Sequence, residues 1–207
     1  MAVTPPMEST TPTLSRKAQI DQTATALFRQ RGYAATSMRE LAAALGIEAG
    51  SIYSHIRSKE ELLHRICFRV ADEFMAGLRT ATVDDLAPAA VHLRRAIDSH
   101  VRVLIRDTDA SAVFLHEWRH LSEPALSEFV QLQRGYEAAF RDMIARGVAD
   151  GALRTPDPAF ATLTLFASLT WLPNWYRPDG KLNPDQIAER LTDQLLGGLA
   201  TGDHLPT

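Results

Sequence analysis

The fold of this chain is decided by residues 36–62, TSMRELAAALGIEAGSIYSHIRSKEEL, which contain two helix starts and a sharp turn. Ser37 stands three residues before Glu40, the spacing of a capping box, in which the hydroxyl and the carboxylate each accept a hydrogen bond from a free backbone amide. The segment SKEE, residues 58–61, repeats that spacing. Gly46 permits a sharp turn because glycine has no Cβ. The stretch therefore predicts two short helices across a turn, followed by a longer helix.

Hydrophobic residues recur at helical spacing on both sides of this stretch. Ile20, Ala24 and Phe28 mark one face of a helix predicted over residues 14–31, with Gly32 as its C-terminal stop. There is no sustained alternation of apolar and polar residues, which half-buried strands require. The sequence therefore predicts an all-α fold. Its nine helices are expected at about residues 14–31, 37–45, 48–55, 58–82, 89–106, 110–121, 124–150, 158–175 and 184–199.

Composition places the chain among ordinary globular proteins, with 207 residues, 45% of them hydrophobic and 23% charged. The only cysteine, Cys67, excludes an internal disulfide framework and fits a reducing cytoplasm. Residues 1–13 lack the basic and apolar regions of a signal peptide and are expected to form a loose tail. Residues 159–176 carry no charge, but their Thr, Ser, Pro and Asn residues favour a buried helix over a membrane span.

Charge is unevenly distributed along the chain. Residues 14–65 contain eight Lys or Arg residues and five acidic residues, whereas residues 66–207 contain fourteen and nineteen. A basic N-terminal part attached to an acidic remainder indicates that only the N-terminal part meets a polyanion.

The two short helices, braced by a helix on either side, predict a helix-turn-helix whose second helix enters the major groove of DNA. That helix offers small polar side chains to base edges and a tyrosine hydroxyl to a phosphate, while the neighbouring helix starts favour phosphate binding. The alternative is that these are well-capped surface helices in which Tyr53 and His55 only pack. The candidate DNA-binding residues are Thr36, Ser37, Arg39, Ala49, Ser51, Tyr53, Ser54, His55 and Lys59.

Two motifs, RGYAAT at residues 31–36 and SIYSHIRSKEEL at residues 51–62, closely resemble the N-terminal domain of the TetR family of transcriptional repressors. The resemblance extends over about residues 15–63. Glu48 stands where a serine or threonine commonly opens the family's recognition helix, and Ala49 stands where a basic residue often follows. The resemblance implies repression through double-stranded operator DNA, with contacts that are fewer or shifted away from the start of that helix.

Residues 116–120, HEWRH, match the pattern H-E-x-x-H. On one helix, two histidines at this spacing share a face and can bind zinc, with the glutamate as general base, so a zinc metallopeptidase is the rival hypothesis. The glycine and third histidine of the metzincin extension are absent, although His92 and His100 leave a weak metal site open. We therefore expect a protein that is not an enzyme, with no cofactor, and we assign no catalytic residue and no metal ligand.

Large apolar side chains and a few polar ones occur together in the C-terminal half, a mixture that is typical of a small-molecule pocket. The alternative is that the aromatic residues only form the core and a dimer seam. The candidate ligand-binding residues are Phe114, Glu117, Trp118, Arg119, Phe166, Trp171, Asn174, Trp175 and Arg177.

The segment WLPNWYRPDGKL, residues 171–182, together with residues 117–119, resembles TetR-type regulators of fatty-acid, phenylacetate and steroid-ring catabolism. The resemblance implies an acyl-CoA thioester as the effector, with apolar walls for the acyl group and arginines for the phosphates. Asn174 stands where that group often has another arginine. The alternative, favoured by Glu117, is a drug-sensing repressor of an efflux pump. Candidate phosphate-binding residues are Arg94, Arg95, Arg102, Arg106, Arg119 and Arg177.

The resemblance also implies a homodimer in which the last two helices pair with their symmetry mates, and such a dimer predicts a palindromic operator. The charge-poor segment at residues 160–175 and the stripe of Ile187, Leu191, Leu195 and Leu199 suit that role. We expect a cytoplasmic repressor that a small effector releases from DNA. Its predicted parts are a tail at 1–13, a helix-turn-helix domain at 14–60, a connecting helix at 61–82, a ligand-binding and dimerisation domain at 83–201 and a second tail at 202–207.

Overall fold

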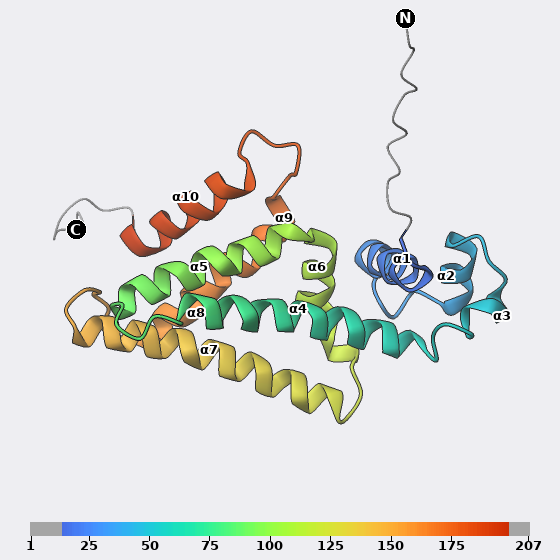
Figure 1. The fold of residues 1–207 in the computed structure, drawn as a ribbon, viewed down its shortest axis with the longest axis horizontal. Helices are drawn as coiled ribbons and strands as arrows, with labels where there is room; N and C mark the ends of the chain where they lie inside the picture. The colour runs from blue at the N-terminus through green and yellow to red at the C-terminus, as the bar shows by residue number, and fades with distance from the viewer. Residues whose placement is uncertain (1–13, 199–207) are drawn as a thin grey trace, which may run out of the picture.

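The computed structural model describes residues 14–198, which contain helices and loops but no strand (Figure 1). The all-α prediction is confirmed, and each of the nine predicted helices has a counterpart. The two predicted tails and Leu199 lie outside the described residues. The elements are α1 (Arg16–Arg31), α2 (Met38–Ala44), α3 (Ala49–Ile52), α4 (Lys59–Ala81), α5 (Ala89–Arg106), α6 (Thr108–His116), η1 (Trp118–His120), α7 (Ala125–Ala149), α8 (Pro158–Thr170), α9 (Leu172–Trp175) and α10 (Pro184–Gly197).

Helices α1, α2 and α3 form a small unit around the N-terminal end of α4 (Figure 1). Phe28, Leu41, Ile52 and Leu62, one from each of these four helices, are almost completely buried and belong to the hydrophobic core. This burial fixes the short helices α2 and α3, which are too short to be stable alone.

The first predicted capping box is complete, whereas the second is present only in part. Ser37 Oγ accepts a hydrogen bond from the Glu40 amide at 3.2 Å, and the Glu40 carboxylate accepts one from the Ser37 amide at 2.7 Å, which completes the first box. Ser58 Oγ likewise accepts from the Glu61 amide at 3.1 Å. The Glu61 carboxylate, however, accepts from the amide of Arg57, one residue earlier than the box requires.

The 23-residue helix α4 runs from the N-terminal unit into a larger helical body formed with α5 to α10 (Figure 1). In that body α4 packs against α5, α6 and α7, while α8 packs against α7 and α10 packs against α5. Helix α6 also contacts α1. The two units are therefore joined through α4 and also through α6.

Two predicted helices are broken. The sixth ends at His116 and continues as the 3-10 turn η1, and the eighth ends at Thr170 and restarts as α9. Pro173 explains the second break, because proline has no backbone N–H to donate and its ring obstructs a continuing helix. No described helix is long and apolar enough to cross a membrane.

Candidate DNA interface and internal cavity

Helix α3 and the turn after it present most of the predicted DNA-binding side chains to solvent. Ile52 and Ile56 are buried and anchor this segment. Between and around them, Tyr53 has 56% of its surface exposed, and Ser51, Ser54 and His55 are also exposed. Ala49 and Arg39 lie on exposed positions of α3 and α2 as well. All six of these residues are therefore accessible on the N-terminal unit.

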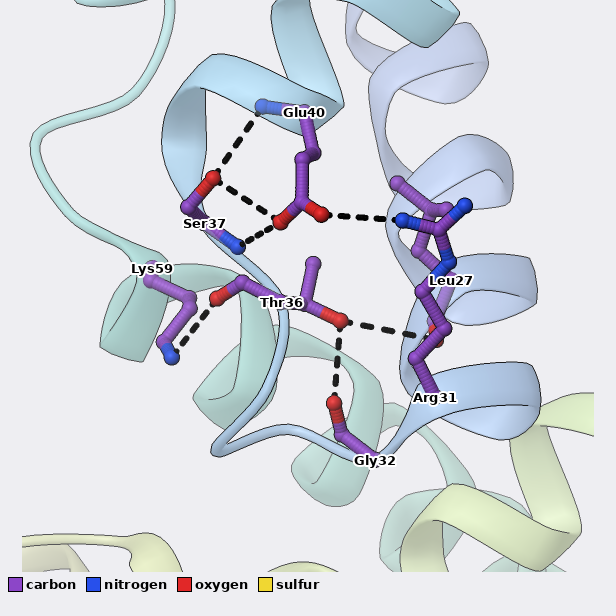
Figure 2. A network of polar contacts seen from close by, with 7 residues as sticks. All are labelled: Leu27, Arg31, Gly32, Thr36, Ser37, Glu40 and Lys59. Atoms are coloured by element: carbon purple, nitrogen blue, oxygen red, sulfur yellow. Dashed lines mark hydrogen bonds and ion pairs between the residues drawn. The ribbon is translucent and has the colours of Figure 1, made fainter.

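Thr36 does not have the position expected for a phosphate-binding residue. Only 3% of its surface is exposed, and its hydroxyl donates a hydrogen bond to the backbone oxygen of Gly32 at 2.9 Å (Figure 2). The side chain therefore holds the turn between α1 and α2, where Gly32 adopts a φ of +84°. The Thr36 hydroxyl is therefore engaged within the protein, whereas the sequence prediction rested on the free amides of this helix start.

Lys59 is also committed to the protein itself. Its ammonium donates to the backbone oxygens of Tyr33 and Thr36, both at 2.8 Å, and lies 4.2 Å from the centre of the Tyr33 ring. Figure 2 shows it reaching across from the start of α4 to the loop before α2. The sequence predicts a cation at a helix start that is available to DNA, and the structure instead shows a brace between α4 and the loop at residues 32–36.

Ser37 and Glu40 close this network on its outer side. Arg31 donates to the Glu40 carboxylate at 2.9 Å (Figure 2). The backbone amide and hydroxyl of Ser37, and then Arg31, lower the pKa of Glu40 below its ordinary value. Glu40 therefore stays ionised at neutral pH and keeps the start of α2 fixed. The Ser37 hydroxyl caps α2, so any contact that it makes with DNA must be compatible with its hydrogen bonds to Glu40.

The body contains an internal cavity of about 110 Å³ between α4, α5, α6, α7 and α8. Its walls are mainly aromatic and aliphatic, and exposed Glu137 marks the side nearest solvent. Of the nine predicted ligand-binding residues, Phe114 and Phe166 line this space. The lining residues are Ala71, Phe74, Met75, His100, Phe114, Leu115, Phe129, Leu132, Gln133, Tyr136, Glu137, Phe166 and Thr170.

The other seven predicted ligand-binding residues do not line the cavity. Leu169 and Leu172 take the inward positions at the end of α8 and the start of α9, which leaves Trp171 and Trp175 64% and 46% exposed. Asn174 and Arg177 are also exposed. The remaining three, Glu117, Trp118 and Arg119, lie at or next to η1. Glu117 therefore does not supply the carboxylate on which the drug-sensing alternative rested, whereas Glu137 does line the cavity.

The HEWRH motif does not form the helix that zinc peptidases use. Helix α6 ends at His116, and His120 belongs to η1. The His120 ring instead stacks on Tyr33 of the N-terminal unit, with ring centres 5.1 Å apart. Trp118 stacks on the cavity residue Phe129 at 5.6 Å. Among residues 14–198, no cluster of three or more His, Cys, Asp or Glu side chains is placed to hold a metal. The motif thus lies at the junction of the two units.

His100 and Tyr136 supply the most deeply buried polar groups of the cavity wall, and neither was among the predicted ligand-binding residues. Both are at least 92% buried, and His100 Nδ1 lies 3.1 Å from the Tyr136 hydroxyl. Burial lowers the pKa of His100 to about 3 and raises the pKa of Tyr136. The burial of His100 could have been predicted from the sequence, because its helical spacing places it on the same apolar face of α5 as Ala96, Ile97 and Leu104.

The candidate phosphate-binding arginines also lie away from the cavity. Arg94 pairs with Asp193 at 2.5 Å, and Arg102 pairs with Asp98 and Asp185. Arg106 pairs with Glu73 at 3.3 Å. The first two arginines connect α5 to α10 through exposed ion pairs at the surface of the body.

The two C-terminal helices present different outer surfaces. On α8, Phe160 and Leu163 are each 65% exposed, and no charged residue occurs between Pro158 and Thr170. On α10, Ile187 is buried, and Leu191 and Leu195 pack against the core. Part of the stripe predicted to form a dimer seam is therefore used within the chain, while the apolar face of α8 remains open.

Comparison with known proteins agrees with this architecture. Residues 20–66 match the family model described as bacterial regulatory proteins, tetR family, and residues 87–199 match the tetracyclin repressor-like C-terminal domain. The repressor KstR2 of Rhodococcus jostii is 26% identical over 199 residues, covering 95% of this chain and 97% of that relative.

Solved structures give the same result. PfmR from Thermus thermophilus has a TM-score of 0.77 and 31% identity, covering 88% of this chain and 99% of that one. AibR, solved in complex with isovaleryl coenzyme A and operator DNA, has a TM-score of 0.75 and 27% identity over 88% of this chain and 98% of that one. The matched families and relatives are transcriptional regulators and not enzymes. The chain therefore belongs to the TetR family of DNA-binding transcriptional regulators.

Proposed function

We propose that this protein is a dimeric repressor whose α2–α3 unit binds a palindromic operator and whose internal cavity takes the acyl group of an acyl-CoA thioester, which releases the DNA. The observation that carries the proposal is the apolar cavity beside α4. That helix begins in the DNA-binding unit and ends in the body, so a group that enters the cavity contacts an element shared by both. A protein that binds operator DNA acts in the cytoplasm.

The exposed segment at α3 supports the proposed operator contacts. Ser51, Ser54 and His55 offer short donors and acceptors to base edges, and Tyr53 offers a hydroxyl to a phosphate. Thr36 and Lys59 support these contacts indirectly, because they fix the loop that leads into Ser37 and the start of α2.

The open face of α8 supports the dimer. Phe160, Leu163 and Trp171 expose a large apolar area on one side of this helix. Soluble proteins seldom leave such a patch uncovered, and a two-fold axis beside α8 would bury it against its own copy. The two recognition helices would then be related by the same axis, which favours a palindromic site.

The size of the cavity supports a short acyl group. A cavity of about 150 Å³ holds benzene, so about 110 Å³ suits a group of roughly five heavy atoms. AibR, which shares this fold, was solved with isovaleryl coenzyme A. The charged part of coenzyme A would remain outside, next to the exposed residues at the mouth, since burying its phosphates without partners is costly.

A chain of ring contacts supports coupling between cavity and DNA. Phe129 lines the cavity and stacks on Trp118 of η1, and His120 of the same turn stacks on Tyr33. The Tyr33 ring and backbone oxygen in turn contact the ammonium of Lys59, which holds the loop before α2. A ligand that displaces Phe129 therefore acts on the support of the DNA-binding unit. Such coupling requires that the ligand bind the two arrangements with different affinity.

A competition experiment tests this function. The operator would be selected from random-sequence duplexes by binding to the protein, and fluorescence anisotropy would then follow its release by CoA thioesters from acetyl to decanoyl. We expect a palindromic site and release that is strongest for short acyl groups. Leu132→Trp, which fills the cavity, should keep operator binding and lose release, whereas Leu86→Trp in an exposed loop should change neither. Operator affinity that no thioester alters would overturn the proposed effector.

A further inference from the structure

One polar side chain of the cavity wall has a buried ring nitrogen without a hydrogen-bond partner among the described residues. His100 lines the cavity from α5 and is 4% exposed, with its ring stacked on Phe74 at 4.5 Å and facing the edge of Phe166 at 5.6 Å. Packing against these rings fixes the plane of the imidazole. Among the described residues, its Nε2 atom has no hydrogen-bond partner.

The partner on the other ring nitrogen determines which atom carries the proton. Tyr136 is 8% exposed, and its hydroxyl lies 3.1 Å from His100 Nδ1, in a site where a buried hydroxyl needs an acceptor for its hydrogen. The hydroxyl therefore donates to Nδ1, and the proton of the neutral imidazole lies on Nε2. Because burial keeps the pKa of His100 well below 7, the ring is neutral at physiological pH. Nε2 is thus a buried donor without an acceptor.

The other polar lining groups lie nearer to solvent. Glu137 is exposed, and Gln133 and Thr170 are half-buried, whereas the residues around His100 are aromatic. A ligand that enters past Glu137 meets apolar walls first and His100 at the buried end. An unpaired donor there favours ligands that bring an oxygen and disfavours those that do not.

We propose that the group bound in this cavity carries a hydrogen-bond-accepting oxygen, such as a ketone, at the end that enters first, and that His100 Nε2 donates to it. His100 is then the residue that selects oxygenated groups over plain hydrocarbon groups, and Tyr136 is a positioning residue that keeps the proton on Nε2. The proposal deepens the proposed function, on which it rests only in taking this cavity as the effector site.

Two small probes of nearly equal shape test the proposal without coenzyme A. Cyclobutanone and methylenecyclobutane differ in an oxygen against a CH₂ group, and their dissociation constants would be measured by NMR titration. The readout is the ratio of the two constants, so a change in cavity size affects both probes alike. Replacing His100 by Phe should shift the ratio against the ketone by at least about fivefold, since the donor is lost. His100→Gln, which returns a donor near Nε2, should recover most of the preference.

Two controls separate this role from a structural one. His92→Phe removes another buried histidine of α5, whose Nε2 already pairs with the Asp84 backbone oxygen at 2.7 Å, and should leave the ratio unchanged. In histidine labelled with ¹⁵N, the Nε2 signal of His100 should shift with the ketone and not with the hydrocarbon, and melting temperatures confirm that each variant is folded. A ratio that His100→Phe does not move, or the failure of both probes to bind, overturns the proposal. Failure of acyl-CoA thioesters to release DNA would overturn only the proposed effector.

Discussion

The DNA-binding unit and the helical body treat their buried polar groups differently. In the first, Thr36 and Lys59 complete their hydrogen bonds with backbone oxygens of the loop at residues 32–36. Among residues 14–198, the buried side-chain atoms that lack a partner are His100 Nε2 and Thr192 Oγ1, and both belong to the body. The DNA-binding unit is therefore complete as it folds, whereas the body retains a donor that a ligand can satisfy.

The largest expected effect is on the free energy of unfolding, when Phe129 is removed from the cavity wall next to η1. Phe129 is fully buried and touches both the cavity and Trp118. Phe129→Ala should lower the free energy of unfolding by about 3–5 kcal/mol, because it removes a buried ring and enlarges a cavity. Urea unfolding measures this. Leu86→Ala, at a 95% exposed position, is the control, and a loss below about 1 kcal/mol in the Phe129 variant would mean that the ring is not part of the core.

Lys59 tests whether the DNA-binding unit depends on its internal brace. Lys59→Met keeps most of the apolar stem but leaves the carbonyl oxygens of Tyr33 and Thr36 without their donor. We expect a loss of about 1–3 kcal/mol in the free energy of unfolding, measured by chemical denaturation. Arg57→Met, at an exposed neighbouring position, should cost much less. Equal stability of the Lys59 and Arg57 variants would show that the lysine is an ordinary surface cation.

The pH dependence of stability tests whether His100 is buried as a neutral imidazole. The pKa of His100 is about 3 in the folded protein and 6.5 ordinarily, so between these values the unfolded chain binds a proton that the folded chain does not. Its contribution to stability is complete above pH 6.5 and decreases as the pH falls toward 3. The wild type should therefore lose up to about 1.4 kcal/mol per pH unit more than His100→Gln. Parallel stability curves for the two proteins would contradict the burial of a neutral imidazole.

Tyr53 should show the smallest effect on stability and a clear effect on DNA. Its side chain is 56% exposed, so Tyr53→Ala should change the free energy of unfolding by less than about 0.5 kcal/mol. Operator affinity should fall about tenfold, because a phosphate contact is lost. Tyr53→Phe, which keeps the ring, separates the hydroxyl from packing. If Tyr53→Ala bound DNA as tightly as the wild type, the interface would lie elsewhere on the unit.

The sequence predicted the helices and the DNA-binding unit more fully than it predicted the cavity. Capping signals such as Ser37 with Glu40 are local, and the structure follows them closely. Cavity lining depends on which side of each helix faces inward and on contacts between distant segments, as for Phe74 and Tyr136. Aromatic content drew attention to Trp171 and Trp175, whereas Leu169 and Leu172 take the inward positions there and both tryptophans are exposed. The internal partners of Lys59 were missed for a similar reason, since they are backbone oxygens that no sequence pattern reveals.

Coupling between the cavity and the DNA-binding unit is tested most directly by its reciprocity. Isothermal titration would measure the affinity of isovaleryl-CoA for the free protein and for the protein saturated with its selected operator. Because linkage is reciprocal, operator DNA should weaken isovaleryl-CoA binding by the same factor by which isovaleryl-CoA weakens operator binding. We predict a factor of at least about five, which Leu132→Trp abolishes. Equal isovaleryl-CoA affinity in the presence and absence of operator would contradict the account.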